Sequence, residues 1–149
     1  MSSIFSGLFS PAPQQLGEKI DVVYVCEWFL FLSFFFVFAS GFLHKFMDAK
    51  VIAKANGGSF LGAFQMACFI PLAYVSYYGI ITWFFSEQFQ ASRTAEERLF
   101  GPVSDNVRKI GEVQIAFQAW DFLISLFNSE LNSVEMLLHH AMTGLLCYW

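Results

Sequence analysis

Four runs of apolar residues, separated by polar stretches, make up most of the chain after its first 21 residues. The first two runs, 22–43 and 60–85, contain a single charged residue between them, Glu27. As helices rising 1.5 Å per residue they would be about 33 and 39 Å long, and the hydrocarbon core of a bilayer is about 30 Å thick. Both runs are therefore predicted to be transmembrane helices.

The other two runs are shorter and carry ionisable residues. Residues 113–127 include Asp121, a polar hinge follows at 128–133, and residues 134–149 include His139 and His140. A helix of 16 residues reaches only about 24 Å. We therefore expect the fourth span to be partial and the domain to continue past the end of the chain. The stretch 86–112, rich in charges and broken by Gly-Pro, is predicted to be a loop.

The pattern predicts an all-α polytopic transmembrane helix bundle with at least three spans and a fourth partly present. Its expected organisation is an N-terminal interfacial segment, 1–21, followed by a transmembrane domain, 22–149, incomplete at the C-terminus. No Lys or Arg precedes Lys19, so the first segment lacks the basic region of a secretory signal. Insertion is then expected to depend on the first span.

Composition narrows the class of protein further. Charged residues are 13% of the chain, against about 25% in an average soluble domain, and twenty residues are Phe. This makes a water-soluble enzyme a poor hypothesis. The net charge is −4 and the chain has no basic run, so no nucleic-acid partner is expected.

No cofactor and no metal are predicted. Cys26, Cys68 and Cys147 lie far apart in apolar stretches, so they are interpreted as small buried hydrophobic residues. Adjacent histidines on a helix diverge by about 100°, and the chain has no His pair four residues apart that could bind a metal.

Ionisable groups at membrane depth are the candidate site. Asp121 and the pair His139–His140 lie on consecutive helices joined by a short hinge, so the helices should be neighbours and an Asp–His hydrogen bond is expected. The contact could hold the helices together or serve as a proton-transferring site. Glu135, four residues before His139, is either a helix cap or a group that orients the imidazole.

The segment from Ala116 to Leu146 resembles the core of a TLC domain, the family of ceramide synthases and translocating-chain-associated membrane proteins. The family places an Asp on one span and His-His followed by Thr on the next, and the matching residues are Asp121, His139, His140 and Thr143. The resemblance implies Asp121, His139 and His140 as catalytic candidates, with Glu135 and Thr143 binding lipid or supporting them. The Ser-Tyr stretch that follows the His-His helix in ceramide synthases would come after Trp149, where the given sequence ends.

Three functions follow as hypotheses. The first is a TLC-like membrane protein that binds, senses or handles lipid acyl chains. The second is a structural accessory subunit of a larger organellar, respiratory or photosynthetic membrane complex. The third is a ceramide-synthase-like N-acyltransferase, so an enzyme is left open. Expected partners are membrane lipids and other membrane subunits. The expected location is the endoplasmic reticulum by resemblance, or an organellar membrane for a complex subunit.

Overall fold

The computed structural model describes residues 20–47, 58–91, 94, 105–128 and 131–148. Throughout these residues the regular structure is helical, in the order α2 (Val22–Phe46), α4 (Gly58–Phe85), α5 (Glu87–Ala91), α7 (Asp105–Phe127) and α8 (Val134–Tyr148). The predicted all-α class is confirmed. Most of the proposed N-terminal segment, 1–21, lies outside the described residues, as do the last residue and most of the stretch between α5 and α7.

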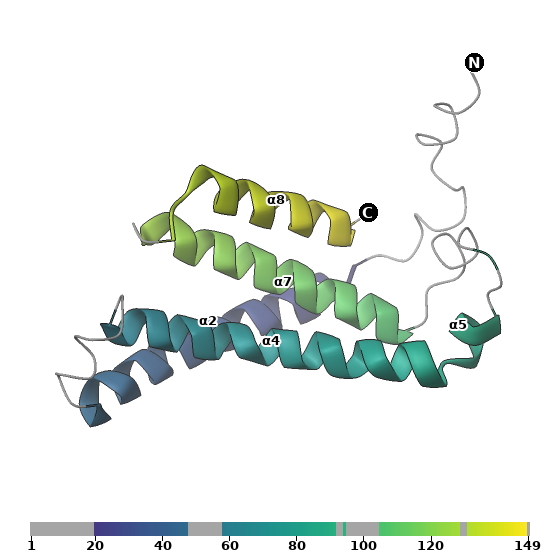
Figure 1. The fold of residues 1–149 in the computed structure, drawn as a ribbon, viewed down its shortest axis with the longest axis horizontal. Helices are drawn as coiled ribbons and strands as arrows, with labels where there is room; N and C mark the ends of the chain where they lie inside the picture. Colours follow the sequence, from purple (N-terminus) through teal and green to yellow (C-terminus); the bar gives the residue numbers. More distant parts are fainter. Residues whose placement is uncertain (1–19, 48–57, 92–93, 95–104, 129–130, 149) are drawn as a thin grey trace, which may run out of the picture.

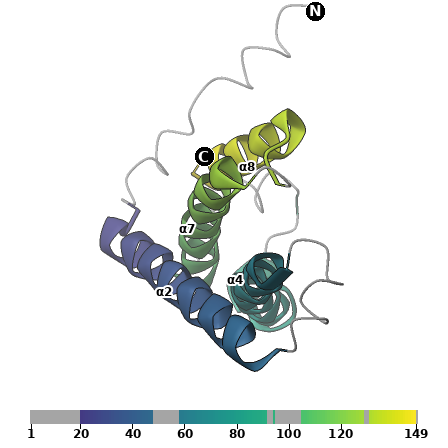
Figure 2. The same ribbon diagram turned by 90° about the vertical axis from the view of Figure 1, so that its left-hand side faces the viewer.

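Three of the long helices, α2, α4 and α7, pack against one another, and α8 lies on the side of α7 that faces away from α2 and α4 (Figures 1 and 2). The hinge between α7 and α8 is as the sequence predicts, because α7 ends at Phe127 and α8 begins at Val134. The Oγ of Ser133 accepts the backbone N–H of Met136 at 3.2 Å, which caps the start of α8.

An apolar cluster joins α2, α4 and α7. Its buried members are Leu32, Ala67, Phe117 and Trp120. The Trp120 ring packs against Phe36 of α2 and Phe64 of α4, with centroids 5.8 Å apart in both pairs. One large ring from α7 thus fills the space between the other two helices.

The sequence misplaces the beginning of the third helix. Residues 105–112, predicted to be loop, form the first two turns of α7. Their charges suggested a loop, but Asp105 and Arg108 pair with each other at 3.2 Å on the outer surface of the helix. Glu112 is buried and accepts the backbone N–H of Asp21 at 2.8 Å, which ties α7 to the beginning of α2.

Among the described residues, two helices, α2 and α4, are long and apolar enough to cross a membrane. Only 11% of the most apolar 18-residue stretch of α2, and 17% of that of α4, is buried within the protein. The core helix of a soluble domain would be mostly covered by its own chain. Both helices instead leave most of their apolar surface exposed.

Candidate functional site

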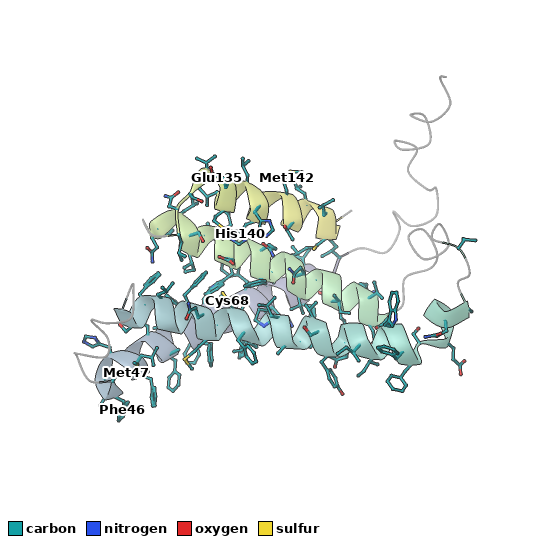
Figure 3. The ribbon with its side chains drawn as sticks, viewed as in Figure 1. Phe46, Met47, Cys68, Glu135, His140 and Met142 are labelled. Atoms are coloured by element: carbon teal, nitrogen blue, oxygen red, sulfur yellow. The ribbon has the colours of Figure 1, made fainter. Side chains whose placement is uncertain are left out.

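Four buried polar side chains meet between α7 and α8. Gln118, Asp121 and Ser125 are spaced by three and four residues, so they share one face of α7. The fourth, His140, extends from α8 toward that face (Figure 3). All four are at most 6% exposed. We call Gln118, Asp121, Ser125 and His140 the polar cluster.

The polar cluster is connected through the imidazole ring and the carboxylate. The Nδ1 of His140 lies 2.8 Å from the Oε1 of Gln118. On the other side of the ring, Nε2 lies 3.5 Å from the Oδ1 of Asp121, an ion-pair distance that is long for a hydrogen bond. The Oγ of Ser125 donates to the same Oδ1 at 3.2 Å. Of the two histidines, His140 is the one that lies beside Asp121, but the two side chains are at ion-pair distance and the expected Asp–His hydrogen bond is not formed between them.

The polar cluster lies within the length of the two apolar helices. Asp121 follows Trp120, which contacts Phe36 and Phe64. Phe36 is ten residues from the end of α2 and Phe64 six residues from the start of α4, or about 15 and 9 Å along the helix axes. If α2 and α4 cross a bilayer, the polar cluster is therefore inside it.

The remaining predicted site residues lie apart from this contact. His139 is exposed, although its ring centroid is only 5.5 Å from that of His140. Glu135 is exposed in the first turn of α8 and points away from α7 (Figure 3), and Thr143 is partly buried. Within the described chain, only His140 of the predicted α8 residues reaches the α7 carboxylate.

Two members of the polar cluster, Gln118 and Ser125, were missed by the sequence reading. The signal that could have found them is their spacing from Asp121, three residues before and four after, which places all three on one helical face. Neither residue is ionisable, so a search for ionisable groups at membrane depth does not find them.

The cysteines are free thiols in the described chain, and their burial differs from the prediction. Cys68 and Cys147 are partly buried, but Cys26 is exposed, because it lies on the outer surface of α2. Cys68 packs against the apolar cluster and lies near enough to Asp121 to interact with it electrostatically. Among the described residues, no group of three or more His, Cys, Asp or Glu side chains is placed to hold a metal ion.

The arrangement suits a contact between two helices better than an open catalytic site. The imidazole and the carboxylate that a general base would need are both buried, and both ring nitrogens face side chains of α7. Comparison with family models, with curated proteins and with solved structures finds no match to this chain.

Proposed function

We propose that the protein is an integral membrane protein whose helices α2 and α4 cross the bilayer. The observation that carries this proposal is their combination of length, apolar composition and low burial. Their 25 and 28 residues correspond to about 37 and 42 Å, more than a hydrocarbon core of about 30 Å. In such a core, helices satisfy their backbone hydrogen bonds internally.

A removable signal sequence passes the same test of length and composition, and α2 lies near the N-terminus. The contacts that α2 makes with α4 and α7 support a permanent helix instead. Leu32 of α2 is fully buried in the cluster that also contains Ala67 and Trp120, and the backbone of Asp21 bonds to Glu112 of α7. Loss of α2 would expose this interior, so α2 is part of the folded domain.

The function proposed for this bundle is TLC-like handling of lipid acyl chains, without catalysis. The class of ligand comes from the resemblance of the Asp and His-His-Thr pattern, and the contact between Asp121 and His140 supports it. A broad apolar surface is available for acyl chains along α2. Its large side chains with at least 60% exposure are Val22, Val23, Leu30, Phe34, Val37, Phe38 and Phe46.

A second candidate is an accessory subunit of a larger membrane complex. It is favoured by α8, which packs mainly on α7 and presents apolar side chains on its other faces. The most exposed of these are Val134, Leu138, Leu145 and Leu146. An N-acyltransferase has less support, because the histidine next to Asp121 is buried.

Membrane crossing is tested by glycosylation mapping in microsomes. The chain contains no Asn-x-Ser/Thr sequon, so one can be inserted between residues 48 and 57 in one variant and between 95 and 104 in another. Because α4 separates the two positions, we expect only one of the variants to be glycosylated. Glycosylation of both would contradict a spanning α4. The unmodified chain is the control.

Lipid contact is tested by photolabelling native membranes with a phosphatidylcholine that carries a diazirine in its acyl chain. Lipid handling predicts labelling of Phe34 and Phe38 both in native membranes and after reconstitution of the isolated chain. If these residues are labelled only after reconstitution, the surface is covered by another subunit in the native membrane, and the second candidate replaces the first.

A further inference from the structure

The geometry of the polar cluster bears on how many protons its imidazole and carboxylate hold and on which atoms these protons lie. Gln118 faces His140 through Oε1, which is an acceptor, and in this orientation the 2.8 Å contact is a hydrogen bond only if the Nδ1 of His140 carries a hydrogen. The other ring nitrogen, Nε2, faces the Oδ1 of Asp121 at 3.5 Å and has no hydrogen-bond partner within the usual limits. A ring protonated on Nδ1 alone would thus direct the lone pair of Nε2 at a carboxylate oxygen.

The hydroxyl of Ser125 limits where a second proton can reside. It donates to the same Oδ1 that faces His140. A carboxylate oxygen has two lone pairs and can accept from both Ser125 and the ring. A hydrogen bond donated to a carboxylate favours its ionised form, so the donation from Ser125 favours the second proton on Nε2 over Oδ1.

We propose that the polar cluster is a proton-binding site in which His140 is an imidazolium, donating through Nδ1 to Gln118 and directing Nε2–H at the carboxylate of Asp121. Aspartate and imidazolium together are net neutral. Neutrality matters inside a bilayer, where an uncompensated charge at the centre of a helix costs several kcal/mol. The proposal concerns protonation alone and holds whether or not the protein binds lipid.

The competing arrangement has the amide of Gln118 turned by 180°. Its NH₂ group would then donate to Nδ1, and a neutral ring would donate from Nε2 to Asp121, leaving a net charge of −1. Two other titratable groups act on the pair, His139 of α8 and Cys68 of α4. Cys68 brings no positive charge and His139 is exposed, so among the described residues His140 is the buried basic group that can compensate the carboxylate.

The proposal is tested by ¹⁵N NMR of the imidazole side chain in lipid nanodiscs at about pH 8, where an ordinary imidazole in water, with a pKa near 6.5, is neutral. The full chain carries His44→Gln and His139→Gln, both exposed positions, so that His140 is the only histidine. A companion chain with His44→Gln and His140→Gln gives the spectrum of an exposed imidazole in the same bilayer.

We expect both nitrogens of His140 to be protonated in this chain. Adding Asp121→Asn should convert the ring to a neutral form with hydrogen on one nitrogen only, because the carboxylate charge that stabilises the imidazolium is removed. A ring protonated only on Nε2 would show that Gln118 is turned and would overturn the proposal. A neutral ring protonated only on Nδ1 before Asp121 is changed would overturn it too, since the second proton is then not on His140. If the Asp121→Asn variant does not fold, the spectrum of the chain that retains Asp121 and has His140 as its one histidine decides between these outcomes.

Discussion

The interface between α2 and α4 and the interface between α7 and α8 join helices in different ways. Rings and small residues meet at the first: Phe36 contacts Phe60 edge to face at 5.1 Å, and Gly62 lies close to Leu43. Hydrogen-bonding groups meet at the second, where Gln118 of α7 binds His140 of α8.

If α2 and α4 cross a bilayer as proposed, the difference matters because lipid is as apolar as the residues that these helices present to each other. Apolar contacts between membrane helices gain stability from close packing rather than from exclusion of water. Polar contacts add direction, since each donor must meet an acceptor. The first interface should therefore respond to changes in volume, and the second to changes in hydrogen-bonding capacity.

The largest expected effect comes from emptying the apolar cluster. Trp120→Ala removes a ring that is 1% exposed and that packs between α2 and α4. We expect the free energy of unfolding to fall by about 3–5 kcal/mol, as for other buried Trp residues. The measurement is SDS-induced unfolding in mixed micelles. Phe34→Ala, at a ring that is 76% exposed, is the control and should change stability by less than about 0.5 kcal/mol. Equal effects would mean that Trp120 does not organise the three helices.

The second effect comes from removing the imidazole at the polar interface. His140→Leu leaves the carboxylate of Asp121 buried opposite an apolar group, and breaking a buried pair in this way costs about 3 kcal/mol or more. The same unfolding measurement applies. His139→Leu is the matched control, since this neighbouring side chain is exposed. A loss at His139 as large as that at His140 would show that burial of His140 is not the cause.

How far the sequence predicts these two interfaces also differs. The apolar runs place α2 and α4 nearly at their observed ends, because hydropathy reports directly on long uncharged helices. The predicted start of the third helix, residue 113, is eight residues too late, because α7 begins at Asp105. Charged residues such as Asp105 and Arg108 occur both in loops and on the outer faces of helices, so the sequence does not separate the two.

The candidate site, too, is predicted only in part by the sequence. Asp121 and a histidine could be paired because a short hinge makes consecutive helices neighbours. The choice of His140 over His139 depends on the rotation of α8 about its axis, which places His140 against Gln118 and leaves His139 exposed. Local sequence does not determine that rotation, because it follows from how the two helices pack.

A smaller effect is expected from Gln118→Leu, which removes the acceptor of the Nδ1 hydrogen of His140. An unsatisfied buried donor costs about 1–3 kcal/mol. Unfolding in mixed micelles measures the loss. Gln65→Leu, at an exposed position of α4, is the control for the change of residue type. No loss at Gln118 would mean that His140 finds another partner.

The smallest effects compare two glycines of α4. A Cβ at position 79 would meet no atom within 4 Å, whereas a Cβ at position 62 would lie 3.1 Å from Cδ1 of Leu43. Gly79→Ala should therefore stabilise the protein by about 0.5–1 kcal/mol through helix propensity. Gly62→Ala should gain less, because Leu43 must move. Melting temperatures of the two variants give the order, and a larger gain at position 62 would contradict close packing of α2 on α4.

A double-mutant cycle between Gln118 and His140, measured by unfolding in mixed micelles, tests most directly whether α8 is held on α7 by a polar contact. The four proteins are the unmodified chain, Gln118→Leu, His140→Leu and the double variant. Polar contacts between membrane helices give coupling energies of about 0.6 kcal/mol on average and up to about 1.7 kcal/mol. We expect a favourable coupling in that range. Additive losses, with no coupling between the two positions, would contradict the account.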